Sequence, residues 1–250
     1  MTRMVLDRQL QALSEQILTM WALSDQAFEK GLEALKQRDS SLCQAAMSYQ
    51  LLIRAARVDI EKRAFSILAL QQPLGGRDLR FVASIPAIVA ELERIGEGGV
   101  EAARVFMQIF SLQEPLVGRD HEAFRAAGGA EEGAMPDLLE LGKEARRLLG
   151  VALKAFAARD AHSASAIWQG KQILNHRYEY VRDELIECLT QMRAMPLLRS
   201  DEQSPRCIVY LLSLAHRLVR VAEHCDAICE RTVFIAGGKS REEQLETIPG

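Results

Sequence analysis

Aromatic residues are scarce in this chain of 250 residues, since phenylalanine, tryptophan and tyrosine together make up only 6% of it. A core with so few rings depends on leucine, isoleucine, valine, alanine and methionine, which suits helix-on-helix packing better than a β-sandwich. Signals for strands are also missing, because no segment alternates strictly and neither Asn-Gly nor Asp-Gly occurs as a hairpin turn. These absences predict an all-α protein.

An excess of charge of one sign is also lacking, and this excludes several classes of partner. The formal net charge is -3, and lysine and arginine are interspersed with acidic residues, so we expect no nucleic-acid partner. The longest apolar run, Cys207–Leu212, is too short to cross a bilayer, and the first residues carry no apolar secretion signal. We expect a cytoplasmic protein without membrane insertion, whose five cysteines stay reduced.

Proline and glycine, although few, divide the chain into long segments with helical periodicity. The expected helices cover residues 6–35, 40–70, 78–112, 136–158, 161–195 and 205–236. Pro86 falls inside the third segment, and we expect it to kink that helix or to mark a later start. Asp39 or Ser40 is expected to cap the second helix.

The sixth segment has the most regular apolar seam of the chain. Its members follow alternating steps of four and three residues, and they are Leu211, Ala215, Leu218, Ala222, Cys225, Cys229 and Thr232. A seven-residue repeat kept over this length predicts near-parallel helix packing with left-handed supercoiling.

Two short matches indicate that the chain is an internal duplication. Arg38-Asp39 recurs as Arg159-Asp160, 121 residues later, and the stretch 93–97 resembles 219–223, which lies 126 residues later. Two three-helix units related by duplication explain both offsets. We therefore divide the chain into a first repeat, a linker, a second repeat and a flexible tail, covering residues 1–113, 114–135, 136–236 and 237–250.

Several motifs resemble the signature of the PhoU family. They are ILALQQP at 67–73, DLR at 78–80 and ELERIGE at 91–97, and the opening LDRQLQALSEQILTM resembles the first helix of that family. The resemblance spans about residues 6 to 236. It implies two tandem three-helix bundles, a homodimer, and a negative regulator of phosphate uptake and phosphate-starvation signalling. The implied partners are the ATPase of a phosphate ABC transporter and a sensor histidine kinase.

The resemblance also implies metal sites, because family members often bind iron, zinc or manganese through carboxylates four residues apart on two helices of each repeat. Such carboxylates share a helix face and supply hard oxygen ligands. Only Glu93, Glu97 and Glu223 keep a carboxylate at the matching positions. The other positions carry Gln50, Arg54, Gly170, Leu174 and Val219. The expected cofactor is therefore either none or a weakly bound divalent or iron-type metal.

Three interpretations of these glutamates remain open. A guanidinium in a cation site is unfavourable, so we favour the hypothesis that Arg54 pairs with Glu93 or Glu97 in place of a metal. A weak site for a single metal, held by Glu93 and Glu97, is the second interpretation. In the third, all three glutamates line solvated faces.

Other residues offer weaker candidates. His216, Glu223, His224, Cys225 and Cys229 crowd the sixth segment as a possible zinc site, but both cysteines lie on the apolar seam, which favours core packing.

Trp21 ends the first apolar stripe, where we expect it to add bulk to the bundle rather than to contact a partner. No catalytic motif is found in the sequence, so we expect no enzyme. The alternatives are a helical scaffold with partners unrelated to phosphate, or a di-metal carboxylate enzyme.

Overall fold

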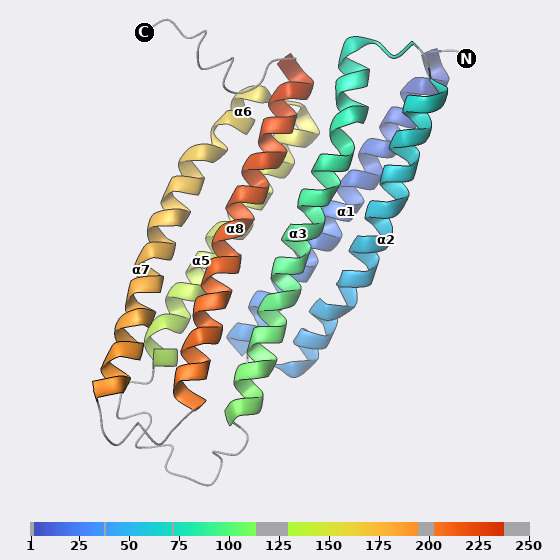
Figure 1. The fold of residues 1–250 in the computed structure, drawn as a ribbon. Helices are drawn as coiled ribbons and strands as arrows, with labels where there is room; N and C mark the ends of the chain where they lie inside the picture. Colours follow the sequence, from blue (N-terminus) through green and yellow to red (C-terminus); the bar gives the residue numbers. More distant parts are fainter. Residues whose placement is uncertain (1–2, 38, 72, 114–129, 195–202, 238–250) are drawn as a thin grey trace, which may run out of the picture.

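The computed structural model describes residues 3–37, 39–71, 73–113, 130–194 and 203–237, and every regular element in these ranges is a helix (Figure 1). The helices are α1 (Arg3–Gln37), α2 (Ser40–Leu70), α3 (Gly76–Gln113), α5 (Ala130–Ala158), α6 (Ala161–Ser165), α7 (Ile167–Ala194) and α8 (Gln203–Gly237). The prediction of an all-α protein with long helices is confirmed. The predicted fifth helix is divided, because the chain turns at Ala166 between α6 and α7.

Pro86 and Pro136 both lie inside helices, and this corrects two predicted starts. Helix α3 begins at Gly76 and continues through Pro86, so the later start is wrong. Helix α5 begins at Ala130 and contains Pro136, so the predicted start at 136 is wrong, and residues 130–135 of the predicted linker belong to this helix. A proline removes one backbone hydrogen bond, which a helix packed along its length can tolerate. Residues 114–129 and 238–250, which include most of the predicted linker and tail, lie outside the described residues.

The two predicted turns have the same capping geometry. The Asp39 carboxylate accepts a hydrogen bond of 2.8 Å from the backbone N–H of Ser41, and Asp160 accepts one of 2.9 Å from that of His162. Each aspartate therefore satisfies a free N–H group at the start of a helix. Hydrogen bonds to the side chain and then the backbone of Ser41 lower the pKa of the Asp39 carboxyl below its ordinary value, and those to Ser163 do the same for Asp160. Asp39, rather than Ser40, is the cap of α2.

The buried residues of α2 and those of its counterpart in the second repeat are related by the same offset of 121 residues. The buried residues of α2 are Cys43, Ala46, Ile53, Ile60, Ala64 and Ile67. Their counterparts 121 positions later are Ala164, Ile167, Leu174, Val181, Leu185 and Cys188, of which only Cys188 is half-buried rather than buried. Equivalent positions in the two repeats can therefore be compared residue by residue.

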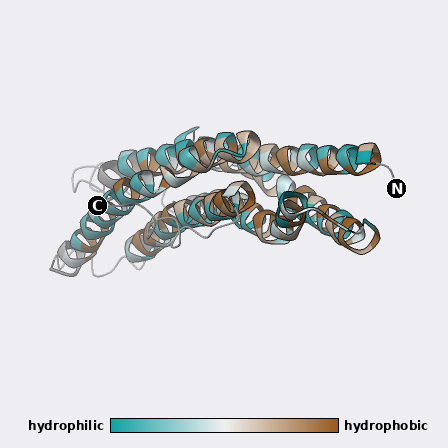
Figure 2. Ribbon diagram, turned by 90° about the horizontal axis from the view of Figure 1, so that it is seen from above, coloured by the Kyte–Doolittle hydropathy of each residue, from teal (hydrophilic) through white to brown (hydrophobic). Residues whose placement is uncertain are grey.

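The two repeats pack through two antiparallel helix pairs. In the first pair, Arg80 of α3 donates to the carbonyl of Ile235 of α8, while Glu91 contacts His224, so positions rise along α3 as they fall along α8. In the second pair, α1 lies against α5 (Figure 1). Seen from above (Figure 2), each helix carries both hydrophobic and hydrophilic residues, so each contributes an apolar side to one shared core.

Polar and aromatic contacts stabilise the packing of α1 against α5. The Arg146 guanidinium donates two hydrogen bonds to Asp25, of 2.7 and 2.9 Å, and a third of 2.6 Å to Glu29. Such a bidentate pair fixes orientation as well as distance. Trp21, which is 1% exposed, stacks on Phe156 with ring centroids 6.4 Å apart. The expectation that Trp21 adds bulk to the bundle is therefore confirmed.

Candidate functional site

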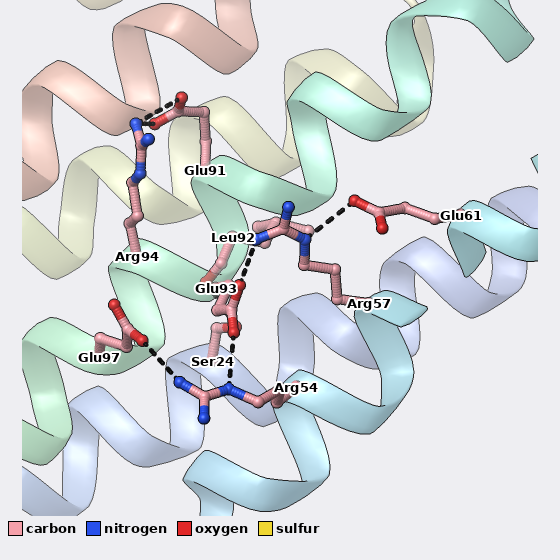
Figure 3. A network of polar contacts seen from close by, with 9 residues as sticks. All are labelled: Ser24, Arg54, Arg57, Glu61, Glu91, Leu92, Glu93, Arg94 and Glu97. Carbon is pink, nitrogen blue, oxygen red and sulfur yellow. Dashed lines mark hydrogen bonds and ion pairs between the residues drawn. The ribbon is translucent and has the colours of Figure 1, made fainter. Parts of the chain in front are cut away.

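The predicted site residues of the first repeat meet between α2 and α3 (Figure 3). Arg54 Nε lies 3.3 Å from Glu93 Oε1, and its Nη2 atom lies 3.6 Å from Glu97 Oε1. The Glu93 side chain is only 12% exposed. The pairing that the sequence predicted for Arg54 is present, and Glu93 does not line a solvated face.

A second arginine completes this network. Arg57 Nη1 donates a hydrogen bond of 2.5 Å to Glu93 Oε2, and its Nε donates one of 2.9 Å to Glu61 (Figure 3). These hydrogen bonds to Glu61 and Glu93 raise the pKa of Arg57 above its ordinary value. Both carboxylate oxygens of Glu93 therefore face a guanidinium group. Sequence reasoning missed Arg57 and Glu61, although positions three and seven residues after Arg54 share its side of the helix.

This geometry does not fit a metal ion in the first repeat. The two guanidinium groups occupy the side of Glu93 from which a cation would be coordinated, and like charges repel strongly where solvent is partly excluded. Among the residues that the structure describes, no group of three or more histidine, cysteine, aspartate or glutamate side chains is arranged to hold a metal. The described residues at this position form a network of ion pairs between α2 and α3.

The second repeat has a different arrangement at the matching positions. Glu223, the third predicted carboxylate, is exposed and lies 3.4 Å from Arg220 of its own helix. Val219 is buried at the position equivalent to Glu93. Glu223 therefore has no acidic neighbour at the position equivalent to Glu93.

The offset of 121 residues also corrects two assignments. The equivalents of Gln50 and Arg54 are Lys171 and Asn175, whereas Gly170 and Leu174 belong to the buried side of the helix. Lys171 forms an ion pair of 2.8 Å with the buried Asp226.

His224 lies in a polar contact between the repeats rather than in a zinc site. Its Nδ1 atom is 2.7 Å from Glu91 Oε2, and because a carboxylate can only accept, the ring N–H donates. Cys225 and Cys229 are buried, as predicted for residues of the apolar seam. His216 instead lies against the ring of Tyr178.

We expect the protein to become less stable in acid because His224 is buried and must then be protonated. Burial lowers the pKa of this histidine below its ordinary value of 6.5 and outweighs the opposing effect of Glu91. The folded chain therefore binds fewer protons than the unfolded chain. The contribution of His224 to the free energy of unfolding is fully present above about pH 6.5 and is lost as the pH falls through the folded-state pKa. We expect the His224→Gln variant to show a weaker acid dependence of its free energy of unfolding, measured by urea denaturation between pH 7 and pH 5. The matched control is His216→Gln, which replaces an exposed histidine of the same helix. If the free energy of unfolding of His224→Gln changes with pH as steeply as that of the wild type, this prediction is wrong.

The structure and its site define a class of protein: a duplicated all-α bundle with an ion-pair network between two helices of the first repeat. None of the described helices is long and apolar enough to span a membrane. The PhoU domain family model matches residues 17–106 and 138–232, which together make up most of the chain. The chain belongs to the PhoU family.

Relatives with known names are similar over nearly the whole chain. The phosphate-specific transport system accessory protein PhoU of Escherichia coli is 25% identical, over 92% of this chain and 85% of that protein. The PhoU homolog of Streptococcus pneumoniae is 28% identical, over 93% and 95% of the two chains. The crystal structure of PhoU from Pseudomonas aeruginosa superposes with a TM-score of 0.77 at 23% identity, covering 93% of this chain and 99% of that one. The last comparison establishes a shared fold.

Proposed function

We propose that this protein is a negative regulator of phosphate uptake and phosphate-starvation signalling, and that it acts through contacts with other proteins. The observation that carries this proposal is the pair of PhoU domain matches, together with relatives named as accessory proteins of the phosphate-specific transport system. The similarity extends over 96% of this chain and 97% of the homolog from Clostridium acetobutylicum. This coverage supports the whole bundle as the regulatory unit.

The proposed partners are the ATPase of a phosphate ABC transporter and a sensor histidine kinase, both reached from the cytoplasm. We further propose that the protein forms a homodimer and performs no reaction itself. The network of Arg54, Arg57 and Glu93 favours the absence of a reaction over a di-metal carboxylate enzyme, because both guanidinium groups pair with a carboxylate that such an enzyme would need as a metal ligand. A scaffold with partners unrelated to phosphate is the remaining alternative.

Deletion of the gene in its host tests the proposal. We expect the deletion strain to express an alkaline phosphatase reporter of phosphate starvation even when phosphate is plentiful, because the repressing contact with the kinase is lost. Wild-type protein supplied from a plasmid should restore repression. The purified chain should also bind the purified transporter ATPase or the cytoplasmic part of the kinase. Unchanged reporter expression together with no binding favours the unrelated scaffold.

A further inference from the structure

We propose that inorganic phosphate binds at the junction of the two repeats, beside the first turn of α3. The site consists of three guanidinium groups, those of Arg77, Arg80 and Arg159, and is called here the arginine site. These groups require only a small ion with several negatively charged oxygens. The choice of phosphate among such ions rests on the proposed function, whereas the anion site itself does not.

The three arginines of this site come from both repeats. At this end of the bundle α3 begins, while α5 and α8 end (Figure 1). Residues three and four apart share a side of a helix, so Arg77, Arg80 and Phe81 lie together on α3. From the second repeat, the Arg159 guanidinium lies over the Phe81 ring, 4.7 Å from its centroid. The fold therefore brings three positive groups together from two distant parts of the chain.

The described carboxylates do not compensate the positive charge of the arginine site. The two nearest in the chain are engaged elsewhere, because Asp78 pairs with Arg3 at 2.6 Å and Asp160 caps α6. Among the residues that the structure describes, none of the three arginines forms an ion pair with an acidic side chain. Burial and repulsion from Arg77 lower the pKa of Arg159 below its ordinary value, against the weaker attraction of Asp78. Like charges held together in this way are stabilised by a bound anion.

Arg80 also has a polar atom that lacks a partner. Its Nε atom is buried and has no hydrogen-bond acceptor in the described part of the chain. Its Nη2 atom donates to the carbonyl of Ile235 at 3.4 Å, which is long for a hydrogen bond. Its Nη1 atom would lie 3.5 Å from a Cβ atom at Gly76, so the guanidinium faces the first turn of α3. Buried polar groups are normally paired, so this guanidinium indicates a missing acceptor, which an oxyanion beside it supplies.

The first turn of α3 provides further donors and room for an anion. An aspartate caps α2 and another caps α6, but α3 follows Gly75, which has no side chain to cap it. The N–H of Leu79 donates to the carbonyl of Gly75 at 2.9 Å, so the N–H groups before Leu79 have no partner within the helix. A Cβ atom at Gly75 would meet nothing within 4 Å. Together with three arginines, such a helix start fits a tetrahedral ion better than a planar carboxylate.

Isothermal titration calorimetry with sodium phosphate measures the affinity of the full-length protein for the ion. The variants are Arg77→Gln and Arg159→Gln, each of which removes one positive charge, from α3 and from the second repeat respectively. Arg77 is exposed, so its variant should keep the helical circular dichroism of the wild type. Arg63→Gln is the matched control, because Arg63 is an exposed arginine near the same end of the bundle and also has no ion pair among the described residues.

We expect the wild type to bind phosphate. Arg77→Gln and Arg159→Gln should each bind it at least about tenfold more weakly, because a hydrogen bond between charged groups is lost. Phosphate should also raise the melting temperature of the wild type and of Arg63→Gln, and should raise that of the other two variants less. Sulfate, which is a tetrahedral dianion, should compete with phosphate.

Several results would overturn the arginine site. If phosphate neither binds to the wild type nor raises its melting temperature, the proposal is wrong. Equal affinity in all variants would show that phosphate binds elsewhere. Adenosine monophosphate separates the free ion from an esterified phosphate group: if it binds in a way that depends on Arg77 and free phosphate does not bind, the assignment to the free ion is wrong. None of these results changes the outcome of the reporter assay, which tests the proposed function independently.

Discussion

Replacing Gly99 by alanine is expected to destabilise the protein by about 3 kcal/mol or more. A Cβ atom at this position would lie 2.4 Å from the Cα atom of Phe28 and 2.7 Å from the carbonyl carbon of Ala27. These neighbours are backbone atoms of α1, which cannot turn aside as a side chain can. Helices α1 and α3 would have to separate, and the buried hydrogen bond of 3.0 Å from Ser24 to the carbonyl of Leu92 would be strained with them.

The next residue of the same helix provides the control. A Cβ atom at Gly98 would meet only the side chains of Val221 and Phe28, at 3.6 and 3.9 Å, which are ordinary contact distances. Because alanine favours a helix more than glycine does, Gly98→Ala should leave stability unchanged or raise it by up to about 1 kcal/mol. Guanidinium chloride denaturation of both variants measures the difference. Similar stabilities for the two variants would show that α1 and α3 are not held at the observed distance.

Removing both guanidinium groups from the network should change the response of the protein to metal ions. In the double variant Arg54→Ala and Arg57→Ala, Glu93 is left largely buried and unpaired, so we expect a loss of about 2 kcal/mol. Added zinc or manganese should then recover part of the melting temperature by binding the freed carboxylates of Glu93 and Glu97, which lie one helical turn apart. The wild type should show no such rise, and chelation should not lower its melting temperature.

A control variant and an elemental analysis test this prediction further. Arg94→Ala, which removes a largely exposed arginine paired with Glu91 of its own helix, should change stability by less than about 0.5 kcal/mol and should not create a metal response. Elemental analysis of the purified wild type should find no stoichiometric iron, zinc or manganese. Stoichiometric metal that disappears in Glu93→Ala and Glu97→Ala would falsify the ion-pair interpretation and restore a metal site.

Local sequence signals predicted a large part of the fold. All seven members of the seam in α8 are buried, including Thr232, whose hydroxyl donates to the carbonyl of Ile228 within its own helix. The cap at Asp39 and its repeat at Asp160 are likewise present. Such features depend on residues within one or two turns of each other, so the sequence contains them directly.

The candidate site was predicted less completely. The motif around Glu93 and Glu97 and the charge of Arg54 were sufficient to predict an ion pair. The second partner, Arg57, was missed, because which of several arginines reaches a carboxylate depends on how α2 and α3 are rotated against each other. The assignment of Gly170 and Leu174 was wrong by one residue, and the alternation of buried and exposed positions along α7 corrected it.

The amino-acid sequence by itself therefore determined the helices, most of their ends, the duplication and the membership of the PhoU family. Each of these depends on periodicity, on capping residues or on a motif within one stretch of chain. Only the tertiary structure decided the antiparallel pairing of the two repeats, the ion pair of Arg146 with Asp25 and the pairing of two arginines with Glu93. These contacts join residues that are distant in the chain, and their geometry depends on the packing of whole helices, which no local pattern encodes.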